Sequence, residues 1–227
     1  MPFTEEKRRA IKNYMLDKIR SREKDFLKKT AENFGISETS VRRYLNDCLR
    51  NGILLEEKEA PTGWRLKTVA AQWNWDLNEG DFEEDSAFWE CIHPFLQDLT
   101  GNVRDIWYYA FTEILNNAIE HSGGSMISCA LQKDELYTEI SIVDNGIGVF
   151  HRIRDYAQEI LGIKMNAAQA ALELYKGKFT TDPSSHSGEG IFFVSKMLSE
   201  FAIWSEDTCY SWQCDDRDRF VQSHLLA

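Results

Sequence analysis

The segment FTEILNNAIEHS, residues 111–122, places a glutamate and an asparagine one helical turn apart. Apolar residues recur on one face of the helix that this segment predicts, so Glu113 and Asn117 share the opposite, polar face. A carboxylate can take a proton from a water or a hydroxyl group, and an amide oxygen can coordinate a hard cation such as Mg²⁺. An ordinary solvated helix face has the same spacing, so the segment alone does not decide between the two interpretations.

A strand-and-glycine motif follows this helix in the chain. The stretch YTEISIVDNGIGVF, residues 137–150, predicts a strand that ends at Asp144, with Gly146 and Gly148 shortly after it. Glycine allows positive φ angles and lets the backbone approach a ligand closely. A ligand site at the end of this strand is therefore one interpretation of the motif.

A second glycine motif lies some forty residues further on. In SHSGEGIFFVSKML, residues 185–198, Gly188 and Gly190 precede an apolar helix. The N-terminus of a helix presents unpaired N–H groups and a positive dipole end, which together favour phosphate binding. Each motif is weak by itself, and it is their order and spacing that indicate a common site.

In this order, the E-x-x-x-N, D-x-G-x-G and G-x-G motifs resemble the ATP-binding boxes of the GHKL superfamily. That superfamily includes gyrase B, the heat-shock-ninety chaperones, mismatch-repair ATPases, sensor histidine kinases and anti-sigma-factor serine kinases. The resemblance covers about residues 86–214 and implies a two-layer α/β sandwich with a mixed sheet and a helical ATP lid at residues 149–187. Phe192 stands where many members have a third glycine, which makes the chain closest in style to the anti-sigma-factor kinases.

The resemblance implies that the motif residues bind ATP with Mg²⁺. Asn117 would coordinate the magnesium ion, Asp144 would accept a hydrogen bond from the adenine amino group, and Glu113 would orient or deprotonate the attacking water or hydroxyl. The other ATP-binding residues that it implies are Gly146, Gly148, Lys178, Thr180, Gly188, Gly190 and Thr208. Lys178 and Thr180 would reach the γ-phosphate from the lid, although a lysine at a helix end is also a common partner of the helix dipole.

A different pattern occupies the N-terminal part of the chain. Its periodicity predicts helices over residues 5–21, 23–35 and 37–52, followed by a hairpin over 53–67. This order resembles a winged helix-turn-helix domain, in which the third helix enters the DNA major groove. The residues that would reach base edges are Thr39, Ser40, Arg42 and Arg43. Many winged helices instead bind proteins or dimerise, and that alternative stays open.

The charge of the chain divides in the same way. Residues 1–72 hold 16 lysines and arginines and 11 acids, a net charge of +5, whereas the remainder holds 10 and 26, a net charge of −16. We therefore predict an α+β protein with a basic winged helix-turn-helix domain at 1–72, an acidic linker at 73–85 and a GHKL-type domain at 86–227. Opposite charges indicate modules with different partners, the basic one facing an anion.

Composition also bears on membrane insertion, secretion and metal binding. No apolar run approaches the roughly 20 residues of a membrane span, and the N-terminal residues lack the apolar core of a signal peptide. The five cysteines are scattered and odd in number, which is typical of reduced thiols in a cytoplasmic protein. Cys209 and Cys214 could hold a metal only if further ligands completed the set.

These observations predict an ATP- and Mg²⁺-binding regulator whose nucleotide state controls its binding to double-stranded DNA, with slow ATP hydrolysis. One alternative is a serine/threonine protein kinase that acts on a partner protein, so the choice between ATPase and kinase stays open. Another is a non-catalytic module that senses the nucleotide and binds a partner protein. Either domain type is compatible with a homodimer, and no membrane partner is expected.

Overall fold

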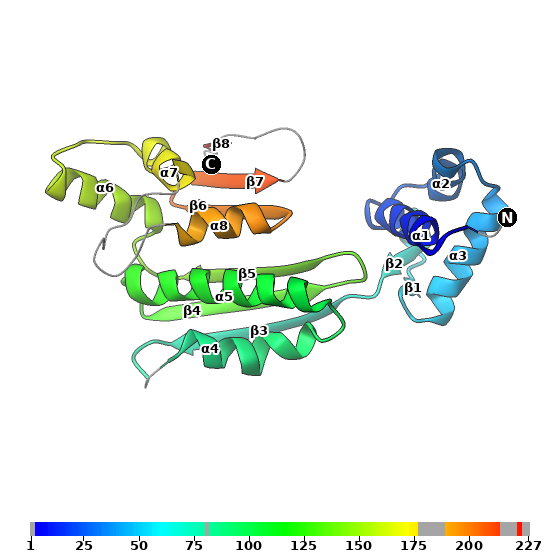
Figure 1. Ribbon diagram of the computed structural model, residues 1–227, viewed down its shortest axis with the longest axis horizontal. Helices are drawn as coiled ribbons and strands as arrows, with labels where there is room; N and C mark the ends of the chain where they lie inside the picture. Colours follow the sequence, from blue (N-terminus) through cyan, green and yellow to red (C-terminus); the bar gives the residue numbers. More distant parts are fainter. Residues whose placement is uncertain (1–2, 80–81, 177–188, 214–221, 224–227) are drawn as a thin grey trace. The chain divides into compact units, whose positions relative to one another are not determined.

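The computed structural model describes residues 3–79, 82–176, 189–213 and 222–223 (Figure 1). The chain divides by its contacts into two units. The first comprises Met1–Ala71 with Ala130–Ile140, and the second comprises Gln72–Cys129 with Ser141–Ala227. Each unit has a hydrophobic cluster of its own.

The first unit contains the three helices and the hairpin that the sequence predicts. Its elements are α1 (Glu5–Arg20), α2 (Phe26–Phe34), α3 (Glu38–Arg50), β1 (Leu54–Glu56) and β2 (Trp64–Leu66). Strands β1 and β2 pair antiparallel, with Leu55 opposite Arg65. The predicted element order is confirmed, and the assignment of this unit to the winged-helix family stays a prediction.

The turn between α2 and α3 is fixed by two local signals. Gly35 ends α2 with φ 62° and ψ 42°, a left-handed conformation that glycine adopts without steric cost. Ser37 precedes α3, and its hydroxyl accepts a hydrogen bond from the Ser40 N–H at 3.2 Å. These two caps set where α3 begins.

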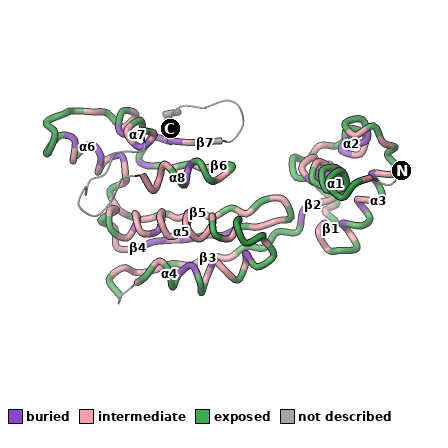
Figure 2. Tube along the Cα trace, in the orientation of Figure 1, coloured by how far each residue is buried: buried purple, intermediate pink, exposed green. Residues whose placement is uncertain are grey.

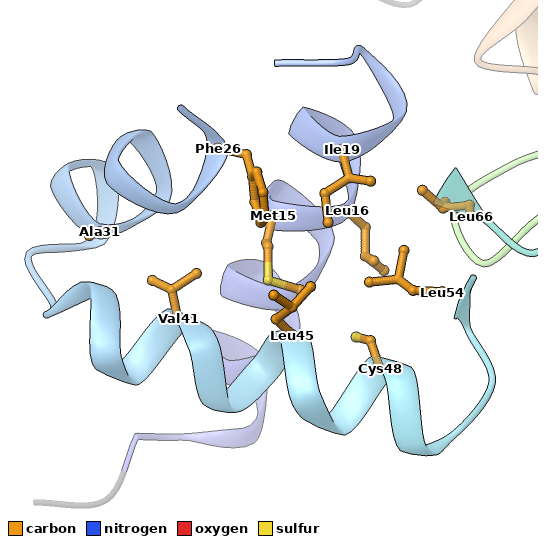
Figure 3. Close-up of a cluster of buried hydrophobic side chains, with 10 residues drawn as sticks. All are labelled: Met15, Leu16, Ile19, Phe26, Ala31, Val41, Leu45, Cys48, Leu54 and Leu66. Atoms are coloured by element: carbon orange, nitrogen blue, oxygen red, sulfur yellow. The ribbon is translucent and has the colours of Figure 1, made fainter. Parts of the chain in front are cut away.

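The core of the first unit lies between its helices and its hairpin (Figure 3). Helix α1 contributes Met15, Leu16 and Ile19, which are at most 1% exposed. The other buried members are Phe26, Ala31, Val41, Leu45, Cys48, Leu54 and Leu66. Because these side chains recur at helical spacing in α1 and α3, the amphipathic pattern of the sequence accounts for the packing.

The segment Ala130–Ile140 also belongs to the first unit, although it lies far along the chain. Leu136 packs against the core just described. Polar contacts join the segment to α1: Lys12 with Glu135 at 2.5 Å, Arg20 with Asp134 at 3.5 Å, and the Arg20 guanidinium over the Tyr137 ring at 4.1 Å. The expected second domain at 86–227 is therefore interrupted by a segment that packs with the N-terminal unit.

The remaining elements begin with a strand that starts just before the second unit. They are β3 (Val69–Asp76), α4 (Glu84–Ala87), η1 (Phe88–Ile92), η2 (His93–Phe95), α5 (Gly101–His121), β4 (Met126–Lys133), β5 (Thr138–Asp144), α6 (Val149–Ile160), α7 (Ala167–Lys176), α8 (Gly190–Met197), β6 (Glu200–Ser205), β7 (Thr208–Gln213) and β8 (Gln222–Ser223). The helices expected in the lid thus correspond to α6 and α7.

The expected acidic linker at 73–85 is wrong over its first residues. Residues 73–76 belong to β3, which pairs with β4. Trp73 and Trp75 alternate with the more exposed Asn74, which is the period of a half-covered strand. The nearby acids concealed this alternation in the sequence.

The described strands form three sheets, and the two-layer sandwich with a mixed sheet stays a prediction. Besides the β1–β2 hairpin, the orders are β3-β4-β5 and β6-β7-β8. Strands β6 and β7 pair antiparallel across a tight turn, and β7 and β8 also pair antiparallel. Strands β4 and β5, like β6 and β7, follow each other along the chain with a short connection, which is typical of antiparallel pairs. The structure is therefore α+β.

A row of helices accompanies these strands. Helix α5 contacts α4 on one side and α8 on the other, and α8 contacts both α7 and β6. In Figure 1, α5 is drawn in front of β4 and β5. Burial alternates along β4, where Ile127 and Cys129 are fully buried between more exposed neighbours (Figure 2). One face of this strand is covered, and α5 buries Phe111 and Leu115 on its own inner face.

Met15 offers a direct test of the first core. Met15→Ala removes a fully buried side chain, and a large-to-small change of this kind costs about 2–5 kcal/mol. We expect the opening free energy of α1–α3, measured by amide hydrogen exchange in the full chain, to fall by about that amount. Asn13→Ala, at an exposed position of the same helix, is the control and should leave exchange unchanged. Equal protection in the two variants would contradict the packing described.

Candidate functional site

Helix α5 carries the predicted acid and amide on one partly buried face. Asn117 and Glu113 are four residues apart, and both side chains are neither fully buried nor fully exposed. The Asn117 amide nitrogen donates a hydrogen bond to the Glu113 carbonyl oxygen at 2.6 Å. Because the nitrogen is used in this bond, the amide oxygen is the end that would meet a cation or a donor.

The carboxylate of Glu113 lies at the start of α8. A Cβ atom built on Gly190, the first residue of α8, would fall 2.1 Å from Glu113 Oε2. Such a distance is far below van der Waals contact, so the carboxylate occupies the place that a side chain at 190 would need. The structure thus brings together Glu113 and Gly190, two residues that the sequence predicts for one site.

The loop after β5 packs against the end of α5. A Cβ atom on Gly146 would lie 2.2 Å from the Ser122 carbonyl oxygen. Ile147 N–H donates to the same oxygen at 3.1 Å, and Gly146 N–H donates to Asp144 Oδ1 at 2.8 Å. The absence of a side chain at 146 therefore allows the loop to approach α5. The hydrogen bond to Asp144 holds the same loop at the end of β5.

Asn145 strengthens the same junction. Its side-chain oxygen accepts hydrogen bonds from Ser125 N–H at 2.8 Å and from Met126 N–H at 3.0 Å. A Cβ atom on Gly124 would lie 2.6 Å from that oxygen, so Gly124 is also a close-approach glycine. The loop that follows α5 and the loop that follows β5 are consequently joined by hydrogen bonds and packed closely together.

On its other side, the loop after β5 meets β6. Gly148 has φ 85° and ψ 144°, a conformation that essentially requires glycine, and its Cβ would lie 2.4 Å from Ser205 Oγ. Ser205 ends β6 and is opposite Thr208 in the antiparallel register. Ser205 Oγ is buried and has no hydrogen-bond partner among the described residues. The predicted residue Thr208 is thus the strand partner of the serine that lies against Gly148.

The turn between β6 and β7 is tied to α6 by charge. Arg154 donates to Glu206 Oε1 at 2.6 Å, and His151 Nδ1 lies 3.0 Å from the same oxygen. Glu206 has φ 55°, so this ion pair fixes a residue in an uncommon backbone conformation. The turn that precedes Thr208 is therefore held against the first turn of α6.

Most of the predicted site residues are joined by this series of contacts. Thr208 pairs with Ser205, and Ser205 lies against Gly148. The loop then leads back to Gly146, which is bonded to Asp144 and lies against Ser122 at the end of α5. Helix α5 carries Asn117 and Glu113, and the Glu113 carboxylate lies against Gly190. Lys178, Thr180 and Gly188 lie outside the described residues. Ser122, Asn145 and Ser205 were not predicted: Ser122 and Asn145 stand next to glycines, where such residues are common in loops, and no sequence motif marks Ser205.

One tyrosine lies close to the acidic end of this series. Burial raises the pKa of Tyr109, and the negative charges of Glu113 and Glu189 raise it further. Tyr109 precedes Glu113 by one helical turn, so the two side chains share a face of α5. Burial and the neighbouring negative charges both favour the protonated phenol.

No group of three or more His, Cys, Asp or Glu side chains that could hold a metal occurs in the part of the chain that the structure describes. The described cysteines are free thiols, and burial raises the pKa of Cys129 to about 12. A thiol of this pKa is not a ready metal ligand. Over the same described residues, no helix combines the length and apolar character needed to cross a membrane.

The residues predicted to contact DNA lie on α3 of the first unit. Thr39, Arg42 and Arg43 are exposed, and within the described residues neither arginine forms an ion pair. Ser40 differs, because its hydroxyl lies 3.0 Å from Ser37 Oγ at the helix cap. Part of the hydrogen-bonding capacity of Ser40 is thus used at the N-terminal cap of α3.

Comparisons with protein-family models, with curated proteins and with solved structures gave no match for this chain.

The contact between Gly146 and Ser122 predicts that alanine lowers the stability of the protein at position 146 but not at position 101. Gly146→Ala sets a methyl group against a backbone carbonyl, and overpacking of this kind costs about 1–3 kcal/mol. We expect a lower Tm, by roughly 2–4 °C per kcal/mol for a chain of this size. Gly101→Ala, where a Cβ meets nothing within 4 Å, is the matched control. A Gly146→Ala protein as stable as the Gly101→Ala protein would show that the close approach is not needed.

Proposed function

We propose that the second unit binds ATP with Mg²⁺ and that the bound nucleotide controls a DNA-binding first unit. The observation that supports this is the series of contacts from Thr208 to Gly190. These contacts lie within one unit and join Asp144, Asn117 and Glu113, the residues proposed to meet the purine, the cation and the reacting water or hydroxyl. The close-approach glycines in the series fit a site where backbone must come near a ligand.

A magnesium ion fits the donor set at Asn117. Mg²⁺ prefers octahedral oxygen ligands and usually keeps only one or two protein ligands when phosphates and water supply the rest. The Asn117 amide nitrogen is bonded to the Glu113 carbonyl, so the amide oxygen is the atom that would serve as the single protein ligand. The ion would supply positive charge to balance the phosphate oxygens.

Asp144 fits recognition of adenine. One of its oxygens accepts the Gly146 N–H at 2.8 Å, and this bond fixes the carboxylate at the end of β5. The carboxylate is an acceptor only, so it matches the 6-amino group of adenine and opposes the 6-oxo group of guanine. This difference would favour ATP over GTP.

Glu113 is the residue proposed to orient or deprotonate the attacking water or hydroxyl. Its carboxylate lies at the N-terminus of α8, against Gly190. A general base must lie within hydrogen-bonding reach of the proton it takes, and a helix N-terminus is a favourable place for phosphate oxygens. One region of the unit would therefore hold both the base and the group to be attacked.

The first unit is proposed to bind double-stranded DNA through α3. Arg42 and Arg43 are exposed on this helix next to Thr39, and the capped turn before it fixes where it begins. Arginine reads guanine edges and also binds phosphates. Strand β5 starts in the segment grouped with the first unit and ends at Asp144 in the second, so the proposed control has a direct covalent path.

Nucleotide binding is tested by thermal unfolding of the full chain with a non-hydrolysable ATP analogue and Mg²⁺. At 100 times Kd, binding adds about 2.7 kcal/mol, so Tm should rise by roughly 5–10 °C. Asp144→Asn should abolish the rise, because its oxygen can still accept the Gly146 N–H while its amide group opposes the adenine amino donor. Asn117→Ala should remove only the part of the rise that depends on Mg²⁺.

The matched control for Asp144→Asn is Asp105→Asn, which neutralises an exposed carboxylate on α5 and should keep the full rise. A GTP analogue should give a smaller rise than the ATP analogue. If the wild-type chain ignores both analogues, or if Asp144→Asn responds as the wild type does, the assignment of the site fails.

DNA binding is tested by titrating full-length protein into random-sequence double-stranded DNA at increasing salt. We expect the affinity to fall as salt rises, because bound phosphates release counterions. Arg42→Ala/Arg43→Ala should weaken binding by about 1–3 kcal/mol for each arginine that contacts the DNA.

Arg8→Ala/Arg9→Ala removes the same charge from the exposed side of α1 and serves as the control. It should retain most of the affinity if α3 is the contact. An equal loss in both double variants would indicate a general charge effect, and no binding at low salt would remove DNA from the proposal.

A further inference from the structure

We propose that the side chain of Arg152 holds a phosphate group at the junction between the end of α5 and the loop after β5. That this phosphate belongs to the bound nucleotide rests on the function proposed above. The predicted site residues include none from α6, so the proposal adds a further phosphate-binding residue to the site.

Arg152 lies in the first turn of α6. Its backbone N–H donates to the Gly148 carbonyl oxygen at 3.2 Å, so the helix begins directly at the loop that carries Gly146 and Gly148. Phe150 and Ile153, on either side of Arg152 in the chain, are at most 2% exposed. Because these two apolar side chains determine which face of α6 is buried, they also set the direction in which the Arg152 side chain leaves the helix.

The guanidinium group of Arg152 lies against Gly123. A Cβ atom built on Gly123 would fall 2.9 Å from Arg152 Nη2, and the φ of 67° at this position is one that glycine adopts without strain. Gly123 directly follows Ser122, whose carbonyl oxygen lies against Gly146. The charge of Arg152 is therefore next to the junction that connects β5 with α5.

This charge has no counter-charge in the part of the chain that the structure describes. Arg152 forms no ion pair there, and its buried Nε atom has no hydrogen-bond partner. A buried N–H group without a partner destabilises a protein, and more so when it belongs to a charged group. An anion bound at the guanidinium would offset this charge.

The acids near this turn of α6 are bonded to other groups. Glu206 accepts a hydrogen bond from Arg154 at 2.6 Å and lies 3.0 Å from His151 Nδ1, and Asp155 lies 3.4 Å from His151 Nε2. Arg154 therefore has the carboxylate partner that Arg152, on the same helix, lacks among the described residues.

The end of α5 supplies only a partial counter-charge. The C-terminus of a helix carries a partial negative charge, so an arginine near Ser122 is favourable there without any ligand. An arginine that served this purpose alone would donate to a terminal carbonyl, and over the described ranges Arg152 makes no such bond. The Ser122 carbonyl oxygen instead accepts the Ile147 N–H.

The chemistry of the missing partner fits a phosphate. A guanidinium is charged at every physiological pH, and its planar N–H groups match the oxygens of a phosphate. Under the proposed function, Asp144 on β5 meets the purine and Asn117 on α5 meets the phosphate-bound cation. Because Arg152 lies beside the junction of these two elements, a phosphate of the same nucleotide is the anion expected there.

The binding test measures the Kd of the non-hydrolysable ATP analogue, with Mg²⁺, for the full chain. Arg152→Gln removes the charge and should raise this Kd by about tenfold or more, because a hydrogen bond to a charged group contributes at least that factor. Arg104→Gln is the matched control, since within the described part of the chain Arg104 on α5 has no ion pair and no nitrogen that is buried without a partner. This variant should stay within about twofold of wild type.

A phosphate probe without a purine makes the test specific. Tripolyphosphate with Mg²⁺ should raise the Tm of the wild type, and the rise should be smaller in Arg152→Gln than in Arg104→Gln. A tenfold higher Kd lowers the stabilisation to about half when the ligand is present at 100 times the wild-type Kd. An equal rise in the two variants, or no rise in the wild type, would overturn the assignment.

The stability of the ligand-free protein separates phosphate binding from a structural role. Because the Arg152 charge is uncompensated before a ligand binds, Arg152→Gln should leave the ligand-free Tm unchanged or raise it. An arginine that stabilised the end of α5 would instead give a lower Tm after the same change. A lower ligand-free Tm of Arg152→Gln therefore contradicts the proposal.

The outcomes also distinguish this inference from the proposed function. If the analogue binds the wild type and Arg152→Gln equally well, only the role of Arg152 fails. If tripolyphosphate stabilises the wild type through Arg152 while the analogue has no effect, the nucleotide assignment fails and the phosphate site remains. If neither compound stabilises the wild type, both fail.

Discussion

The loop after β5 can lie against the end of α5 only because residue 146 has no side chain. At 2.2 Å from the Ser122 carbonyl oxygen, a Cβ atom at this position would force two backbone segments apart. The same carbonyl accepts the Ile147 N–H, so the contact is also a hydrogen bond that a shifted loop would lose. Because this junction connects the strand that ends at Asp144 with the helix that carries Asn117, the relative position of these two residues depends on it.

Different atoms occupy the side-chain space of the other two glycines of the site. At Gly148 it is the hydroxyl of Ser205, and the backbone has a positive φ as well, so both sterics and conformation require glycine. At Gly190 it is the end of the flexible Glu113 side chain, which could move aside. A methyl group at 190 would therefore cost the fold little and would instead displace the carboxylate. Of these three glycines, Gly190 is the one whose side-chain space is occupied by a carboxylate.

The sequence predicted the features that local physics controls. The helices of the first unit follow from apolar periodicity, and their ends follow from Gly35 and Ser37, whose effects reach only a few residues. Strand β3 was missed, because acids near Trp73 and Trp75 resemble a linker. The packing of Leu136 on the first unit, and the contact of Glu113 with Gly190, join residues far apart in the chain, and periodicity carries no information about such pairs. The family resemblance nevertheless included Glu113 and Gly190, the two partners of the second contact, because its motifs consist of residues expected at one binding site.

The carboxylate of Glu113 adds a negative charge at the start of α8, and the neighbouring residues determine how that charge could be balanced. A helix N-terminus stabilises an anion, and Glu113 already places a carboxylate at the start of α8. Under the proposed function, the phosphates of ATP would approach the same positive end and would be repelled by that carboxylate. A cation held by the Asn117 oxygen would offset this repulsion, since a divalent ion is the largest local charge in such a site. The bond between the Asn117 amide nitrogen and the Glu113 backbone then has a consequence, because it fixes the cation ligand one turn from the charge to be balanced. The four-residue spacing of acid and amide on α5 is therefore an electrostatic requirement of the proposed site, and not only a way to place both on one face.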